Sequence, residues 1–66
     1  MNITANGRAR EVPHGLTVAG LVDHLALPEG SVAVQRNGDA LLPAEFATVV
    51  VEEGDEIEIV KAVAGG

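Results

Sequence analysis

The sequence predicts an α+β domain in which one helix packs on one face of a small mixed sheet. Three observations favour this fold class. Asn-Gly pairs at residues 6–7 and 37–38 are typical of tight hairpin turns. Residues 17–28 have helical periodicity, and residues 56–63 alternate as a strand does. A single amphipathic helix must bury its apolar stripe, so we expect it to cover one side of the sheet.

The chain begins with a predicted β-hairpin. Residues 1–5 alternate apolar and polar side chains, and the 6–7 pair supplies the two residues that tolerate positive φ in the turn. Residues 8–12 should return as the second strand, with a register less clear than the turn itself. The Pro-His-Gly stretch at 13–15 then turns the chain.

The helix is predicted over residues 17–28. Its apolar positions follow the spacing i, i+3, i+4 and i+7, at Val18, Leu21, Val22 and Leu25. Thr17 is suited to cap the helix, and Pro28 should end it, because the residue before a proline is pushed out of the α region. Gly20 costs about 1 kcal/mol relative to alanine, which a close approach of the helix to the sheet would explain.

The second half of the chain should complete the sheet. We predict a strand at 31–36, a short apolar piece at 41–42, a strand or a helical turn with a strand at 46–51, a turn at 52–55 and the last strand at 56–63. The first and last strands would pair in parallel at the centre, which is the β-grasp arrangement.

Length and charge limit the function classes. The 66 residues form one domain, residues 1–66, in which residues 62–66 are expected to be a protruding, flexible C-terminal tail. Ten acidic residues against four basic ones give a net charge of −6, which disfavours nucleic acid and anionic membranes as partners. With no basic leader and no long apolar run, we expect a cytoplasmic protein that is monomeric when free.

No catalytic or metal-binding motif is predicted. His14 and His24 have no second ligand or base at a motif spacing, and the acidic residues of 52–58 fit a solvated turn and strand face without the spacing of a calcium loop. The chain has no cysteine and is too short for a large enclosed pocket. We therefore expect neither enzymatic activity nor a bound cofactor.

The C-terminal Gly65-Gly66 pair is the feature that suggests a function. Two glycines without side chains let the backbone enter a narrow slot, and the last five residues can reach about 17 Å when extended. The terminal carboxylate is ionised and must be activated before it can transfer a group. The chain lacks a phosphate-binding loop for that step, so an activating partner is implied.

The last strand suggests where a partner docks. If Ile57 and Ile59 face the core, the opposite face changes from charged at its start to apolar at Val60 and Ala62. These two side chains would then lie exposed beside the tail. Ordinary surface apolar residues are an equally good explanation.

Taken together, these segments resemble the ThiS family, ubiquitin-like sulfur-carrier proteins of thiamine thiazole biosynthesis. The resemblance covers the length, the early Asn-Gly hairpin, "TVAGLVDHL", "VAVQRNG", "LPAEF", "EEGDEIEIV" and the terminal "VAGG". The Gly-Asp turn before the final strand and the terminal diglycine are the most specific parts.

The resemblance implies a site and partners. Gly66 would be adenylated by a ThiF-like enzyme using ATP, and then converted with a sulfur donor system to a thiocarboxylate that gives its sulfur to a ThiG-like thiazole synthase. Gly65 and Ala64 would pass into the partner's active site. Many relatives have a basic residue and then a tryptophan after the proline, where this chain has Ala44 and Phe46. Phe46 is thus a candidate docking residue.

Three alternatives stay open. The same terminus is used by sulfur carriers for molybdopterin, cysteine or tRNA thiolation. A ubiquitin-like protein modifier would form an isopeptide bond through Gly66, although Lys61 is the only lysine available for building chains. The third alternative is a β-grasp interaction module whose tail has no role.

Overall fold

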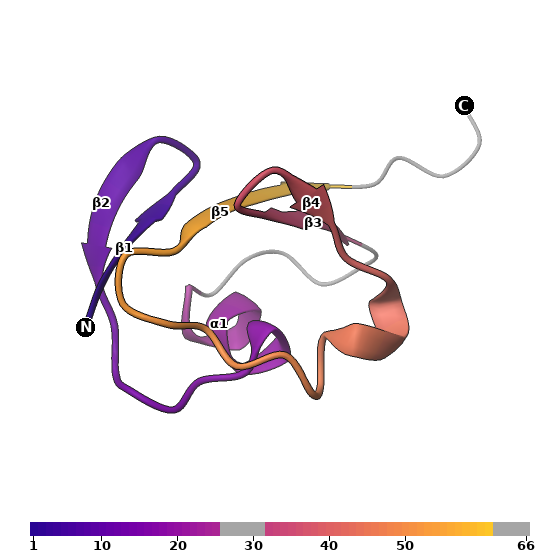
Figure 1. The fold of residues 1–66 in the computed structure, drawn as a ribbon, viewed down its shortest axis with the longest axis horizontal. Helices are drawn as coiled ribbons and strands as arrows, with labels where there is room; N and C mark the ends of the chain where they lie inside the picture. The colour runs from indigo at the N-terminus through magenta and orange to yellow at the C-terminus, as the bar shows by residue number, and fades with distance from the viewer. Residues whose placement is uncertain (26–31, 62–66) are drawn as a thin grey trace.

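The computed structural model describes residues 1–25 and 32–61, which form a helix packed on one face of a mixed sheet (Figure 1). This arrangement confirms the α+β prediction. The helix predicted to run to Pro28 ends earlier, at His24, with Leu25 as its C-cap. Pro28 itself and the expected tail at 62–66 lie outside the described residues.

The described part of the sheet has five strands in the order β2-β1-β5-β3-β4. β5 is central: β1 pairs with it in parallel through Thr4–Glu56 and Ala5–Ile57, and β3 pairs with it in antiparallel fashion. The predicted β-grasp pairing of the first and last strands is therefore confirmed. The strands are β1 (Asn2–Ala5), β2 (Arg8–Glu11), β3 (Val32–Arg36), β4 (Asp39–Ala40) and β5 (Glu56–Lys61).

Helix α1 (Val18–His24) begins as its sequence predicts. Thr17 adopts an extended backbone, and its hydroxyl accepts a hydrogen bond from the Gly20 amide at 3.1 Å. Val18 and Leu21 are fully buried, and the remaining predicted stripe residues, Val22 and Leu25, are partly buried against the same core.

The explanation expected for Gly20 is wrong. A Cβ added there would lie 3.3 Å from Leu16 Cδ2 and 3.4 Å from the Thr17 hydroxyl oxygen. These atoms belong to the residues that lead into α1, and no sheet atom is as near. Gly20 thus keeps space free around the helix cap, and its own amide donates to that cap.

Residues 46–51 were expected to be a strand or a helical turn with a strand, and the structure has a turn with one isolated bridge and no strand there. A short 3-10 helix, η1 (Pro43–Glu45), is followed by a turn, and the β-bridge of this segment joins Val50 to Thr17. Val51 is nevertheless buried in the core, and its amide donates to the Leu16 carbonyl at 2.8 Å. This segment covers the start of α1 instead of extending the sheet (Figure 1).

The core lies between α1 and the covered face of the sheet. It consists of aliphatic side chains from β1, α1, β3, β5 and the connecting segments: Ile3, Ala5, Val12, Val18, Leu21, Val34, Val51, Ile57 and Ile59. In a domain of this size each such side chain contributes a large share of the small net stability.

We predict that Leu21→Ala lowers the free energy of unfolding by about 2–5 kcal/mol, because it removes a fully buried side chain and leaves a cavity. Leu42→Ala is the matched control, since Leu42 is 67% exposed and should change stability by no more than about 0.5 kcal/mol. Urea denaturation followed by circular dichroism measures both. Equal losses in the two variants would contradict the assigned core.

Candidate functional site

β5 separates its side chains as the sequence predicts. Ile57 and Ile59 are buried in the core, whereas Glu56, Glu58 and Val60 are exposed on the opposite face of the sheet. Val60 is 57% exposed, and it lies one residue before the end of β5. The expected change from a charged to an apolar outer face along β5 is therefore confirmed as far as Val60.

An open hollow lies beside Val60 on the uncovered face of the sheet. It measures about 340 Å³, and its apolar lining comes from three neighbouring strands and the segment after β4. The apolar lining residues are Ala33, Val34, Ala40, Leu41 and Val60, and the polar ones are Gln35 and Glu58. We call this the Val60 hollow. In this hollow Val60 lies near apolar residues that were not predicted as docking residues, because β3 pairs with β5 and β4 pairs with the far side of β3.

Phe46, the other proposed docking residue, lies elsewhere. It is partly buried against the core, and its carbonyl accepts a hydrogen bond from the Ala19 amide at 2.8 Å. The described lining of the Val60 hollow does not include it. A partner contact through Phe46 stays a prediction, and so do the proposed roles of Ala62, Ala64, Gly65 and Gly66, which lie outside the described residues.

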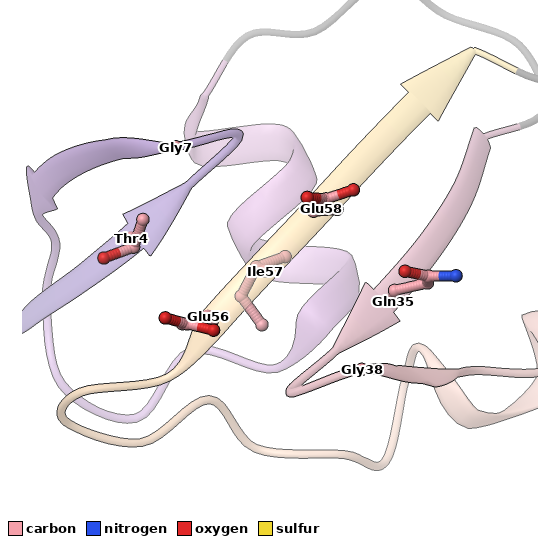
Figure 2. Close-up of a pocket in the computed structure, with 7 residues that line it drawn as sticks. All are labelled: Thr4, Gly7, Gln35, Gly38, Glu56, Ile57 and Glu58. Atoms are coloured by element: carbon pink, nitrogen blue, oxygen red, sulfur yellow. The ribbon is translucent and has the colours of Figure 1, made fainter.

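A second hollow, of about 270 Å³, lies at the start of β5 (Figure 2). Glu56 and Glu58 stand on the central strand, between Thr4 of β1 and Gln35 of β3, while α1 lies behind the sheet. The Asn-Gly turns approach from both sides, as the positions of Gly7 and Gly38 show. The uncovered face is thus acidic at one end of β5 and apolar at the other.

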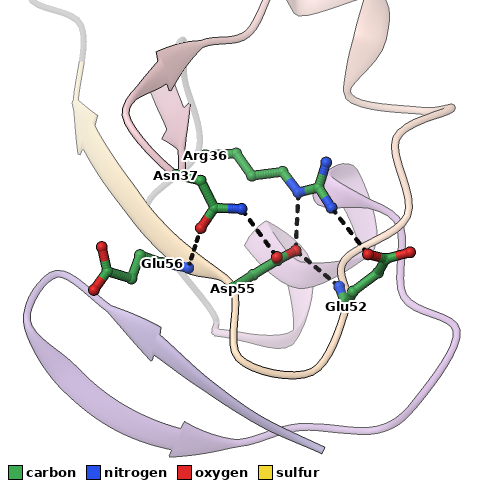
Figure 3. A network of polar contacts seen from close by, with 5 residues as sticks. All are labelled: Arg36, Asn37, Glu52, Asp55 and Glu56. Atoms are coloured by element: carbon green, nitrogen blue, oxygen red, sulfur yellow. Dashed lines mark hydrogen bonds and ion pairs between the residues drawn. The ribbon is translucent and has the colours of Figure 1, made fainter.

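Asp55 holds the start of β5 in place, and the sequence analysis missed this role. It is only 6% exposed, and its carboxylate accepts hydrogen bonds from Arg36 Nε at 2.8 Å, Asn37 Nδ2 at 3.1 Å and the Glu52 amide at 2.8 Å (Figure 3). Arg36 also lies 3.6 Å from the Glu52 carboxylate. Asp55 is therefore a buried structural anion and not part of a solvated acidic face.

The charge of Asp55 is stabilised by these partners. Burial alone opposes ionisation, but the hydrogen bonds from the Glu52 amide, Arg36 and Asn37 outweigh it and lower the pKa of Asp55 below its ordinary value. The hydrogen bond between Arg36 and the Asp55 carboxylate in turn raises the pKa of Arg36. A sequence signal for this arrangement exists: Gly54, at φ +84°, permits the turn that places an aspartate directly before β5.

The remaining sequence candidates do not form a site in the described residues. His14 and His24 are both exposed, on the turn before α1 and on its last residue. Within residues 1–25 and 32–61, no three His, Asp or Glu side chains gather as metal ligands would.

As for membrane spans, the described part of the chain contains no helix of sufficient length and apolar character to cross a bilayer.

Comparison with known families and structures gives one consistent match. The model described as the ThiS family matches residues 3–66. The crystal structure of a thiamine biosynthesis protein (ThiS) from Geobacter metallireducens is 32% identical, with a TM-score of 0.87 over all of both chains. The solution structure of a thiamine biosynthesis protein from the same organism has a TM-score of 0.81 at 32% identity, covering all of this chain and 88% of that one.

Two curated relatives are longer. Thiazole synthases from Paramagnetospirillum magneticum and Magnetococcus marinus are each 35% identical over 66 residues. This match covers all of the chain but only 20% of each synthase, so the chain spans about a fifth of the length of these relatives.

The lowered pKa of Asp55 predicts a pH dependence of stability. The unfolded chain binds the Asp55 proton first, so the contribution of Asp55 is complete above the ordinary carboxyl pKa of about 3.9 and is lost as the pH falls through the lower native pKa. We expect Asp55→Asn to lower the free energy of unfolding by about 1–3 kcal/mol at neutral pH and to flatten its fall in acid.

Urea denaturation between about pH 6 and pH 2 measures this effect. Glu58→Gln removes an exposed carboxylate of β5 and serves as the control, which should keep the wild-type slope. If Asp55→Asn and wild type lose stability in parallel as the pH falls, Asp55 is not the group responsible.

Proposed function

Because this chain belongs to the ThiS family, we propose that it is a sulfur carrier for thiamine biosynthesis and that Gly66 is the residue that holds the sulfur. The family match, which runs through residue 66 and so includes the diglycine, is the observation that carries the proposal. The likeness to a thiamine biosynthesis protein over the full length of both chains supports it.

The chemistry follows from the carboxylate of Gly66. Its oxygen attacks the α-phosphorus of ATP in an adenylating partner, pyrophosphate leaves, and an acyl-adenylate is formed. A sulfide-equivalent donor then displaces AMP and leaves a thiocarboxylate. Gly65 and Ala64 are small enough to follow the carboxyl group into a narrow active site. In this proposal the chain is a co-substrate, and the partners are the enzymes.

The partners proposed are a ThiF-like adenylating enzyme, a sulfur donor system and a ThiG-like thiazole synthase. Two curated relatives that contain a match to this whole chain are themselves named thiazole synthases. This likeness favours a thiazole synthase as the acceptor of the sulfur over the alternatives in molybdopterin, cysteine or tRNA thiolation.

The Val60 hollow is the proposed docking surface. It is apolar, it lies on the sheet face that α1 does not cover, and Val60 is close to the end of β5, from which the proposed tail continues. A partner that buries this hollow would hold the domain beside its own active site while the tail enters. Binding and chemistry would thus use different parts of the chain.

We expect the 66-residue chain, incubated with its adenylating enzyme, ATP and a sulfur donor, to gain the mass of a sulfur-for-oxygen exchange localised to Gly66. Mass spectrometry of the C-terminal peptide measures it. Deleting Gly66 should abolish the gain and leave the circular dichroism spectrum and the urea midpoint unchanged, because a terminal residue buries little surface. An unmodified peptide with a demonstrably active enzyme would overturn the carrier function.

A second prediction concerns docking. Val60→Glu should weaken binding to the adenylating enzyme by at least about tenfold, because a carboxylate would be desolvated in an apolar contact. Val50→Glu is the matched control, since Val50 is a 48% exposed valine outside the described lining of the hollow. Isothermal titration calorimetry measures both affinities. Equal Kd values for the two variants would argue against the Val60 hollow.

A further inference from the structure

The two Asn-Gly turns hold β5 from opposite sides. Asn6 and Asn37 both have φ of 51°, and each is followed by a glycine with positive φ. Figure 2 shows the turns on either side of β5, at the labels Gly7 and Gly38. In both turns the asparagine side chain leaves its own hairpin and bonds to the main chain of β5.

Asn37 acts at the start of β5. Its main-chain amide donates to the Glu56 carbonyl at 2.8 Å, and its side-chain oxygen accepts from the Glu56 amide at 2.9 Å. Its side-chain nitrogen donates to Asp55, which adds Asn37 to the hydrogen-bond network around that carboxylate (Figure 3). These contacts stabilise the entry of β5 into the sheet.

Asn6 acts near the other end of β5. Its main-chain amide donates to the Ile57 carbonyl at 2.9 Å, as the next residue of a parallel ladder would. Its side chain then bonds both main-chain groups of Ile59, which lies two residues after Ile57 in β5. Oδ1 accepts from the Ile59 amide at 2.8 Å, and Nδ2 donates to the Ile59 carbonyl at 3.0 Å. The asparagine amide thereby takes the place of a peptide group of β1.

This contact extends the support of β5 beyond β1. The main-chain pairing of β1 with β5 has only two residue pairs and ends at Ala5–Ile57. β3, in contrast, pairs with β5 as far as Lys61. The last residues of β5 would therefore be held on one side only, by β3, if the Asn6 side chain did not fix Ile59 on the other.

We propose that Asn6 is a positioning residue for the sulfur-carrier reaction, which fixes the end of β5 and with it the point from which the C-terminal carboxylate is delivered to the partner. This inference rests on the proposed function. Its physical basis is that Ile59 stands next to Val60 of the hollow and close to the end of β5, so a displaced Ile59 changes where the chain leaves the sheet relative to the docked surface. A misplacement of about 1 Å at a reacting centre can cost up to about a hundredfold in rate.

The test compares Asn6→Gly with Asn37→Gly. Glycine accepts the positive φ of both turns, so each variant loses only side-chain hydrogen bonds. Asn37→Gly removes bonds to both Glu56 and Asp55, and it should therefore destabilise the fold at least as much as Asn6→Gly does. If Asn6 had a purely structural role, Asn37→Gly would reduce carrier activity at least as much as Asn6→Gly.

The readout is steady-state adenylation of each folded variant by the adenylating enzyme, with pyrophosphate release as the signal. We expect Asn6→Gly to lower kcat about tenfold with KM changed less than about twofold, because the Val60 hollow keeps its lining while the end of β5, from which the carboxylate is delivered, is no longer fixed. Asn37→Gly should keep both values within about twofold of wild type. Hydrogen exchange of the Ile59 amide, followed by NMR, should accelerate more in Asn6→Gly than in Asn37→Gly, because only the first variant removes the acceptor of that amide.

The outcomes separate this inference from the function on which it rests. A wild-type chain that is not adenylated by an active enzyme overturns the carrier function and the inference with it. An active wild type with kcat unchanged in Asn6→Gly, or reduced equally in both variants, overturns the positioning role and leaves the carrier function standing.

Discussion

The buried carboxylate of Asp55 is the interaction on which the rest of the fold depends. The carboxylate joins the turn before β5 to the end of β3 through Arg36 and Asn37. The main-chain carbonyl of Asp55 also accepts a hydrogen bond from the Thr4 amide of β1 at 2.9 Å. One residue thus brings together the three strands at the centre of the sheet. Because the carboxylate is buried, each of these partners is required: a buried anion with an unmet hydrogen bond would cost more than it contributes.

With its start held at Asp55, β5 presents two different faces to two different tasks. Its isoleucines complete the core under α1. Its outward residues form a surface that runs from the hollow beside Glu56 to the Val60 hollow. The strand therefore links stability to recognition: whatever shifts its register would expose the isoleucines and bury the glutamates at once. Asn6 and Asn37 oppose such a shift, because each bonds a particular residue of β5.

Sequence reasoning was most successful where one residue type permits one backbone shape. The Asn-Gly turns, the Thr17 cap and the parity of Ile57 and Ile59 follow from local conformational preference and alternation, and the structure confirms them. It failed where a residue's role depends on distant neighbours. Asp55 looks like its acidic neighbours in the sequence, yet it alone among them is buried.

The sequence by itself determined the fold class, the face that each residue of β5 presents and the family to which the chain belongs. These properties are local or are carried by motifs, and they need no knowledge of which strands become neighbours. Only the tertiary structure decided that Asp55 is an internal anion, that Ala33, Ala40 and Leu41 join Val60, and that Asn6 reaches Ile59, 53 residues later. Those contacts depend on the pairing of β5 with β1 and β3, which brings together residues that are far apart in the sequence.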